Sequence, residues 1–339
     1  MSDSPLIKIE NLNVDFPLGR ALFGKPPMLR AVNDVSIEIM PRKFFGLVGE
    51  SGSGKTTLGR AILRAAPITS GKINFDNGKD RYDIEEMTKP QLKEYRKQAQ
   101  LIFQDPYAAL SPRMTVRDII AEPLEVMELT QTREETDVRV REIASKCRLN
   151  LEHLRRFPHA FSGGQRQRIS IARTLVCNPN FVIADESVAA LDVSIQADIL
   201  NLLKSLQNDL GLTFLFISHD LSVVAHICDT VAVMYLGTII ESAPTRSLFA
   251  KPQHPYTKAL LSAIPSLHPE DRGKSQKLEG EIPSPATPPS GCRFHTRCPN
   301  VIERCSKEEP ITEFSEAGHM VKCHRWQELQ NGPGKELNF

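Results

Sequence analysis

An α/β fold with a largely parallel β-sheet is the fold class that the sequence predicts. Four short apolar segments, each bounded by charged or turn residues, have the length and composition of buried strands. Amphipathic segments lie between them, and this alternation is typical of parallel sheets covered by helices. No internal repeat is present, which excludes two tandem copies of one domain. The predicted strands are residues 43–49, 99–105, 180–186 and 212–220.

The helical parts of the prediction differ along the chain. Residues 198–211 have helical periodicity and end at Gly211, a residue type that often follows a helix C-terminus. Residues 115–160 contain no run of strand type, so we expect an inserted helical subdomain within about residues 105–175. After about residue 241 the periodic pattern fades. Residues 281–291 carry four prolines in their first nine positions, which predicts an extended linker.

Charge and hydropathy exclude some classes of function. The 339 residues include 42 Lys and Arg against 41 Asp and Glu, a net charge of +1 that does not favour a nucleic-acid partner. The first ten residues lack a basic region followed by an apolar run, so we expect no signal peptide. The longest uncharged apolar run of the second half has eleven residues, whereas a membrane span needs roughly 20. Any membrane role is therefore expected to act through a partner.

Residues 49–57, with the sequence GESGSGKTT, match the phosphate-loop motif G-x-x-x-x-G-K-[ST]. They follow a predicted strand and lead into a helical segment, which is the context that the motif requires. Backbone N–H groups of such a loop point at phosphate oxygens, Lys55 adds a positive charge, and the Thr56 hydroxyl would bind Mg²⁺. Nucleotide binding follows. The predicted phosphate-binding residues are Gly49, Ser51, Gly52, Ser53, Gly54, Lys55, Thr56 and Thr57.

Four polar residues lie at the ends of predicted strands and are expected at one edge of the sheet, where such folds bind ligands. Asp185 would hold Mg²⁺ through water, and Glu186 would orient or deprotonate the attacking water. His219 would reach the γ-phosphate, and Gln104 would reach Mg²⁺ and the water. An acidic pair alone could be the solvated end of a strand, but the phosphate loop favours the catalytic interpretation.

A second turn of phosphate-binding type occupies residues 162–165, with the sequence SGGQ. Ser162 and Gln165 have the spacing of a capping box, which explains these two residues without a ligand. Two consecutive glycines weaken a first helical turn unless something approaches the backbone closely, and an anion would do so. One nucleotide already has a phosphate loop. We therefore expect this turn to cover the ATP of a second subunit arranged head-to-tail.

Six segments in this order resemble an ATP-binding-cassette (ABC) ATPase, over about residues 6–240: GESGSGKTT, LIFQD, FSGGQRQR, FVIADE, AALD and FISHD. The resemblance implies a P-loop NTPase fold and Mg²⁺-dependent ATP hydrolysis. It also implies that the signature residues Ser162, Gly163, Gly164 and Gln165 complete the partner's ATP site. Asp192 would belong to a loop that senses the opposite subunit. Gln104 would lie in the segment that contacts transmembrane partners.

The resemblance narrows to the ATPases of oligopeptide and dipeptide importers, and it extends over nearly the whole chain. It rests on segments such as FQDPYAALSPRMTV, HPYTKALLSAIP and the tail CRFHTRCPN…CHRW. Phe161 replaces the usual Leu and Ser187 the frequent Pro, at positions that supply no phosphate or water contact. The resemblance implies that this chain lies at the cytoplasmic face of the inner membrane. Its implied partners are a second, related ATPase chain, two permease subunits and an extracytoplasmic solute-binding protein.

We therefore expect three parts: a nucleotide-binding domain over residues 1–240, a linker or regulatory segment over 241–290, and a cysteine-rich module over 291–339. Within the first part, Phe16 is the candidate that stacks on adenine, and Phe23 competes with it. A core or surface role is the alternative for either phenylalanine.

Seven cysteines are unevenly spaced. Cys147, Cys177 and Cys228 are scattered and are expected to be small buried hydrophobes. The other four cluster near the C-terminus, where a reducing compartment favours metal ligation over disulfides. Four thiolates suit Zn²⁺ or an iron–sulfur cluster, and the resemblance implies [4Fe–4S]. The four candidate ligands are Cys292, Cys298, Cys305 and Cys323, and nearby His295, His319 and His324 are expected in surface or supporting positions.

Other functions are compatible with parts of this pattern. The same kind of transporter could import short oligosaccharides, opines or nickel complexes. A soluble ABC ATPase acting on ribosomes or DNA generally has two cassettes in one chain or a long coiled-coil insertion, and this sequence has neither. A third alternative makes the cysteine module a metal or redox sensor with the ATPase as its output.

Overall fold

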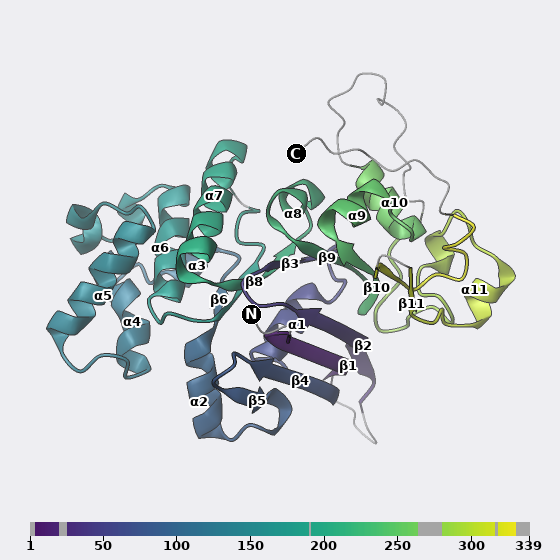
Figure 1. Cartoon of the computed structure of the whole chain (residues 1–339), viewed down its shortest axis with the longest axis horizontal. Helices are drawn as coiled ribbons and strands as arrows, with labels where there is room; N and C mark the ends of the chain where they lie inside the picture. Colours follow the sequence, from purple (N-terminus) through teal and green to yellow (C-terminus); the bar gives the residue numbers. More distant parts are fainter. Residues whose placement is uncertain (1–3, 20–25, 190, 264–279, 316–317, 330–339) are drawn as a thin grey trace. The chain divides into compact units, whose positions relative to one another are not determined.

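The computed structural model describes residues 4–19, 26–189, 191–263, 280–315 and 318–329 (Figure 1). These residues form two compact units, each made of segments that are distant in the sequence. Described residues of the first unit are 4–7, 39–44, 74–189 and 191–217. Those of the second unit are 8–19, 26–38, 45–73, 218–263, 280–315 and 318–329.

Parallel strands form the sheet of the first unit. The central strand pairs on both sides, with Ile183 opposite Leu101 on one neighbour and opposite Leu215 on the other. All of its residues are buried, which explains its continuous apolar sequence. Three of the four predicted strands are therefore confirmed here, although the first ends three residues early. In order, the strands are β6 (Ala99–Ile102), β7 (Phe181–Asp185) and β8 (Thr213–Ser218).

Helices dominate the remainder of the first unit, and the helical prediction for residues 115–160 is confirmed. The hydroxyls of Thr115 and Thr132 begin two of these helices by accepting the N–H of Asp118 and of Glu135. In Figure 1, α4 packs against both α5 and α6. The helices are α2 (Lys89–Gln98), α3 (Pro106–Ala109), α4 (Val116–Val126), α5 (Arg133–Lys146), α6 (Gly163–Leu175) and α7 (Val193–Leu210). Short 3-10 helices are η1 (Ile84–Glu86), η2 (Leu151–Arg155) and η3 (Pro158–Ala160), and β5 (Arg81–Asp83) is a short strand.

The sheet of the second unit combines parallel and antiparallel pairs. Strand β3 runs parallel to β9. The other neighbours pair antiparallel, in the order β9, β10, β12 and β11. The fourth strand predicted from the sequence is thus confirmed as well. Strands of this sheet are β3 (Phe44–Val48), β9 (Thr230–Tyr235), β10 (Thr238–Pro244), β11 (Glu313–Phe314) and β12 (Met320–Val321).

Three N-terminal strands were not predicted from the sequence. They are β1 (Ile7–Pro17), β2 (Met28–Ile39) and β4 (Ser70–Asp76), with β1 between the other two. In β2 the buried residues Val35, Ile37 and Ile39 alternate with exposed ones. This period of two was a usable signal, because alternation is typical of a half-buried strand.

Short helices complete the second unit, and two of them lie where the sequence pattern fades after residue 241. Those two are α9 (Thr245–Ala250) and α10 (Pro255–Ser262), too short for a helical period to be recognised. Residues 281–284 have no helix or strand, in agreement with the predicted linker. The remaining helices are α1 (Lys55–Ile62), α8 (Leu221–Ile227), α11 (Glu303–Lys307) and the 3-10 helix η5 (His295–Arg297).

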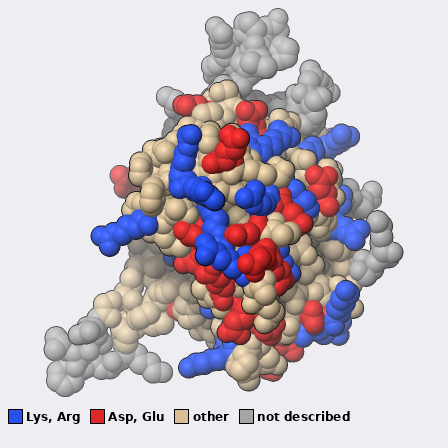
Figure 2. Space-filling view, turned by 90° about the vertical axis from the view of Figure 1, so that its left-hand side faces the viewer, with Lys and Arg blue, Asp and Glu red and all other residues tan. Residues whose placement is uncertain are grey.

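Charges of both signs are interspersed on the face shown in Figure 2. In helix α4, Arg117 contacts both Asp118 and Asp137. In the described part of the chain, no helix has both the length and the apolar composition needed to cross a bilayer.

Candidate functional site

Glycines shape the phosphate loop between β3 and α1. Gly49 and Gly54 have φ angles of 155° and 104°, which favour glycine. A Cβ atom on Gly49 would lie 2.2 Å from the Met234 carbonyl oxygen. On Gly54 it would lie 2.3 Å from that of Ala31. The two motif glycines are therefore required by backbone packing as well as by the motif.

Lys55 is buried at the start of α1, with 5% of its surface exposed. Its Nζ donates to the carbonyl oxygens of Gly49 and Glu50, at 2.8 and 2.9 Å. No side chain caps α1, whose first residues include Thr56 and Thr57. An uncapped helix N-terminus beside a lysine is suited to bind phosphate, because its N–H groups and dipole both favour an anion.

Residues far along the chain support this loop. The Glu50 N–H donates to the Tyr256 hydroxyl at 3.0 Å, and the Gly237 N–H donates to the Ser53 carbonyl oxygen at 2.8 Å. The Glu50 carboxylate accepts hydrogen bonds from both terminal nitrogens of the Arg297 guanidinium. The sequence did not predict these supports, since nothing in a local pattern pairs residues so far apart.

In the first unit, Gln104 and Glu186, both expected at one edge of the sheet, are in contact. The Gln104 Nε2 donates to Glu186 Oε2 at 2.8 Å. Asp185 is buried as the last residue of β7, and Glu186 follows it, half-buried. The Glu186 N–H donates to the Ile217 carbonyl oxygen of β8 at 2.9 Å. A carboxylate held in this way at a strand end can orient or deprotonate a water molecule.

His219 belongs to the second unit and follows Ser218, the last residue of β8. Its side chain is exposed. The next residue, Asp220, begins α8 by accepting the Ser222 N–H at 2.9 Å. A strand end and a capped helix thus fix the backbone on both sides of His219.

The SGGQ turn begins α6 as a capping box, which confirms the structural alternative. Ser162 Oγ accepts the Gln165 N–H at 3.4 Å, and Gln165 Oε1 accepts the Ser162 N–H at 3.0 Å. A Cβ on Gly164 would lie 2.5 Å from Ile195 Cγ2 of α7, so helix packing already requires this glycine. Of the two glycines, Gly164 therefore needs no bound anion to explain it. Ser162 and Gln165 remain exposed, as does Asp192 before α7.

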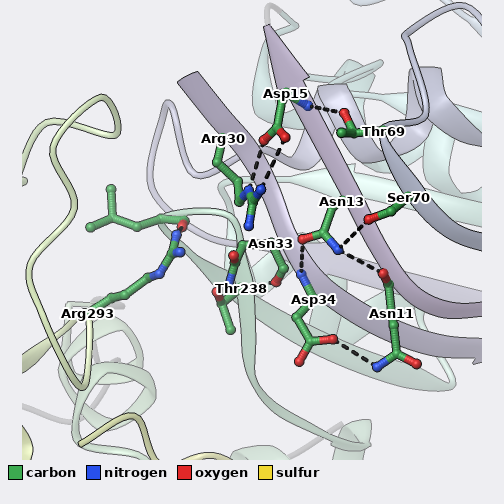
Figure 3. A network of polar contacts seen from close by, with 11 residues as sticks. Asn11, Asn13, Asp15, Arg30, Asn33, Asp34, Thr69, Ser70, Thr238 and Arg293 are labelled. Carbon is green, nitrogen blue, oxygen red and sulfur yellow. Dashed lines mark hydrogen bonds and ion pairs between the residues drawn. The ribbon is translucent and has the colours of Figure 1, made fainter. Parts of the chain in front are cut away.

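Figure 3 shows a polar network around β1 and β2. The candidate Phe16 follows Asp15, a member of this network, in the sequence. Asp15 accepts two hydrogen bonds from Arg30, at 2.8 and 3.2 Å, and its N–H donates to Thr69 Oγ1 at 2.9 Å. Phe16 is half-buried near the end of β1. The competing Phe23 lies outside the described residues. The network therefore fixes the backbone that carries Phe16.

None of the seven cysteines forms a disulfide. Cys147, Cys177 and Cys228 are buried, as predicted. Burial raises the pKa of Cys147 to about 12 and that of Cys177 to about 11, so these thiols are protonated and unreactive.

The other four thiols share one neighbourhood in the second unit. Burial raises the pKa of Cys292 to about 12, and the charges of Cys298, Cys305 and Cys323 contribute to the shift. Three of the sulfurs accept a backbone N–H from the residue two positions further on, which is Phe294 for Cys292, Asn300 for Cys298 and Arg325 for Cys323. Such hydrogen bonds stabilise a thiolate and fit a metal-bound sulfur.

The side chains around the four thiols are not arranged as a preformed metal site. Within the described ranges, no three His, Cys, Asp or Glu side chains are placed to hold a metal ion. The chemistry of the four thiols therefore fits a metal, whereas the described geometry is not that of a closed coordination shell.

Two of the nearby histidines lie where the sequence analysis expected them. His295 Nδ1 is 2.9 Å from the Cys292 carbonyl oxygen, and His324 Nε2 is 3.0 Å from that of Glu308. His319 differs, because it is 3% exposed and its Nε2 lies 2.7 Å from Glu241 Oε1. Glu241, fully buried on β10, also accepts the N–H groups of Gln253 and His254. His319 thus helps to satisfy a buried carboxylate, and no local sequence pattern predicts this contact.

Family comparisons agree with this arrangement. Residues 32–189 match the family described as ABC transporter. Residues 240–305 match the family described as oligopeptide/dipeptide transporter, C-terminal region. The two matches cover the phosphate loop, the SGGQ turn, the Gln104–Glu186 contact and three of the four clustered cysteines.

Relatives of known name span nearly the whole chain. A protein of Brucella ovis, named for peptide import and ATP binding, is 47% identical over 325 residues, which are 96% of this chain and 99% of its own. The dipeptide transport ATP-binding protein DppF of Haemophilus influenzae is 44% identical over 321 residues, 95% of this chain and 97% of its own.

Solved structures show the same fold. The cassette MJ0796, in a dimeric post-hydrolysis state with ADP and Pi, is 26% identical with a TM-score of 0.61, and the match covers 71% of this chain and 99% of that one. The protein cbiO1 from Clostridium perfringens, part of the ABC transporter complex cbiONQ, is 26% identical with a TM-score of 0.62. That match covers 73% of this chain and 92% of the other.

Fold, phosphate loop and matches together define the class of protein, which is the ATP-hydrolysing cassette of an ABC transporter. The sequence identity of 47% and 44% to these relatives, over almost the full length, identifies a narrower family. The chain belongs to the oligopeptide/dipeptide transporter family of ATP-binding subunits.

Proposed function

We propose that this chain hydrolyses ATP to power the import of di- and oligopeptides through separate permease subunits. The observation that carries the proposal is the full-length similarity to ATP-binding proteins named for peptide import and dipeptide transport, C-terminal region included. The sequence also contains the residues that the family resemblance assigns to ATP hydrolysis.

In this proposal the phosphates of ATP bind to the loop 49–57 and the N-terminus of α1, with Lys55 beside the β- and γ-phosphates. Mg²⁺ would neutralise phosphate charge, held by Thr56, Gln104 and, through water, Asp185. Glu186 orients and accepts the proton of the attacking water. The Gln104 amide, which donates to Glu186, keeps the carboxylate in place until the water arrives.

The remaining assignments follow the family resemblance. His219 contacts the γ-phosphate and stabilises its charge as the bond to the leaving group breaks. Phe16 stacks on the adenine. Ser162, Gly163, Gly164 and Gln165 cover the ATP of the opposite subunit, and Asp192 senses that subunit. Exposure of Ser162, Gln165 and Asp192 supports these roles, because a partner can reach them.

The proposed assembly contains a second, related ATPase chain, two permease subunits and an extracytoplasmic solute-binding protein. The ATPase chains lie at the cytoplasmic face of the membrane and are held there by the permeases. Nucleotide chemistry belongs to residues 1–240, residues 241–290 form a linker or regulatory segment, and the cysteine module occupies residues 291–339.

We further propose that Cys292, Cys298, Cys305 and Cys323 ligate a [4Fe–4S] cluster, with Zn²⁺ as the alternative. Their common neighbourhood and the N–H groups donated to three sulfurs support a metal-bound state. Iron, zinc and acid-labile sulfide should be measured on protein purified without oxygen. About four irons and four sulfides per chain are expected for the cluster. One zinc without sulfide would identify the alternative, and neither metal would overturn the proposal.

The cargo is tested by uptake in the source cell. Wild-type cells and cells carrying Glu186→Gln would receive labelled di- and tripeptides, with short oligosaccharides, opines and nickel complexes in parallel. Selective loss of peptide uptake is the expected result. Loss of another solute with intact peptide uptake would reassign the cargo and keep the transporter class. Unchanged uptake of every solute would contradict the importer proposal.

A further inference from the structure

The phosphate loop is held by the segment that carries the clustered cysteines. Arg297 Nη1 and Nη2 donate to Glu50 Oε2 and Oε1 at 2.7 and 3.2 Å. The Arg297 side chain is 5% exposed and that of Glu50 is 24% exposed. A two-bond pair of this geometry, largely removed from water, is stronger and more directional than an exposed ion pair.

Arg297 is itself fixed by its surroundings. It ends η5, which lies between Cys292 and Cys298, and its N–H donates to the Phe294 carbonyl oxygen at 3.0 Å. Phe294 is 1% exposed. Its ring makes edge contacts with Tyr235 and Tyr256, each at 5.3 Å between centroids. The backbone that carries the guanidinium is therefore held by a packed aromatic cluster.

Glu50 connects this cluster to the loop through its backbone. Its N–H donates to Tyr256, and its carbonyl oxygen accepts Lys55 Nζ at 2.9 Å. A shift of Glu50 therefore shifts the partner of the lysine that would bind phosphate. The carboxylate of Glu50 accepts the two hydrogen bonds from Arg297, and it also interacts with the Tyr256 hydroxyl.

A second connection runs from the cysteine module to the same loop. Arg293 donates to the Leu236 carbonyl oxygen, in the turn between β9 and β10. Figure 3 shows Arg293 beside Asn33 and Thr238 at this turn. The next residue, Gly237, donates its N–H to the Ser53 carbonyl oxygen at 2.8 Å. Two arginines that lie between Cys292 and Cys298 thus support the loop at two positions, Glu50 and Ser53.

We propose that Arg297 is a positioning residue for the phosphate loop, so that the folded state of the cysteine module sets the affinity of this chain for ATP. The inference rests on the proposed binding of ATP phosphates by residues 49–57. With Arg297 in place, Glu50 and the loop N–H groups stand in the orientation that binds phosphate. When the module loosens, Glu50 is released from Arg297. ATP must then order the loop as it binds, and the free energy of this ordering lowers the affinity.

Three variants of the full-length chain test the inference: Arg297→Gln, Glu50→Gln and the double variant. A fluorescent ATP analogue with Mg²⁺ is titrated to obtain Kd, and the thermal unfolding midpoint is recorded for each protein. Each single variant is expected to raise Kd about tenfold, and the double variant no more than either single one, because both remove the same contact. Arg297→Lys should recover part of the loss, since lysine keeps the charge without the two-bond geometry.

The module is tested with Cys298→Ser, next to Arg297. It should raise Kd as Arg297→Gln does, and it should have no further effect in the Glu50→Gln background. Arg304→Gln is the matched control. Arg304 lies in the same module and pairs with Glu308, but its side chain is 60% exposed. The Kd of the Arg304→Gln variant for the ATP analogue should therefore stay within about twofold of wild type.

Lys55→Ala separates the inference from the proposed function. If Lys55→Ala leaves Kd unchanged, the proposed phosphate site is wrong. If Lys55→Ala abolishes binding while Arg297→Gln and Glu50→Gln stay within about twofold of wild type, the positioning role alone is wrong. Should Arg297→Gln fail to fold, Glu50→Gln decides, because it leaves the module's own sequence intact.

Discussion

Glu186 adopts a left-handed backbone conformation, with φ 46°, directly after the last residue of β7. Outside glycine, this conformation costs on the order of 1–2 kcal/mol. The N–H bond to Ile217 and the side-chain bond from Gln104 hold the residue there. Such strain is found mainly where the surrounding structure fixes a functional group. The sequence predicted both residues at strand ends. It could not predict their contact, because Gln104 lies beyond the end of β6 at Ile102.

His254 is the residue whose charge state should affect stability most clearly. Burial lowers its pKa from 6.5 to about 4, although the Glu241 carboxylate opposes the shift. The folded pKa is below the unfolded one, so His254 contributes stability above pH 6.5. That stability is lost as the pH falls toward 4. The shift corresponds to an effect on the order of 3 kcal/mol.

Thermal unfolding midpoints of wild type and His254→Asn between pH 7 and pH 4.5 measure this effect. Asparagine can retain the helix cap that His254 Nδ1 provides to Tyr256. The variant should lose less stability on acidification than wild type does. Glu241 and Tyr256, the titratable neighbours of His254, are common to both proteins. Parallel decreases in the two midpoints would show that His254 does not carry the effect.

Among the secondary-structure elements, continuous apolar strands were predictable and alternating ones were missed. β7 and β8 are buried throughout, which gives a strong local signal. The hairpin of β9 and β10 begins in the eleven-residue apolar run of the second half, whose sequence pattern does not divide it into two strands. Its turn is Leu236-Gly237, with φ angles of 43° and 83°, and it lacks the Asn or Asp that marks such turns in a sequence. Helix α7 was predicted but begins at Val193, five residues before the expected start.

Packing of α6 against α7 makes Gly164 a structural requirement. Gly164→Ala would place a Cβ 2.5 Å from Ile195 Cγ2, so the helices must separate. We expect a loss of about 1–3 kcal/mol, seen as a lower thermal unfolding midpoint. Adding Ile195→Ala should recover much of the loss, because it removes the clashing methyl group. If Gly164→Ala is as stable as wild type but no longer hydrolyses ATP, the glycine serves nucleotide contact instead.

For the molecule as a whole, contacts between distant segments were beyond local sequence patterns. The ion pair of Glu50 and Arg297 joins positions 247 apart, and Glu241 meets His319 across 78 positions. Cysteine spacing did predict that the four C-terminal thiols gather. It could not show that the same segment holds the phosphate loop, because that requires the fold of residues 230–262 to bring the two together. The family was predictable from local motifs, whereas the distant contacts that support the phosphate loop were not.

The measurement that tests the central claim most directly is single-turnover ATP hydrolysis by wild type and Glu186→Gln, with ATP retention measured on the same samples. Glutamine keeps the shape of the side chain and can still contact Gln104, but it cannot accept a proton. We expect Glu186→Gln to bind ATP as tightly as wild type and to hydrolyse it at least about a hundredfold more slowly. Bound ATP should accumulate in a closed dimer. Hydrolysis at the wild-type rate would contradict the assignment of Glu186 as the catalytic base.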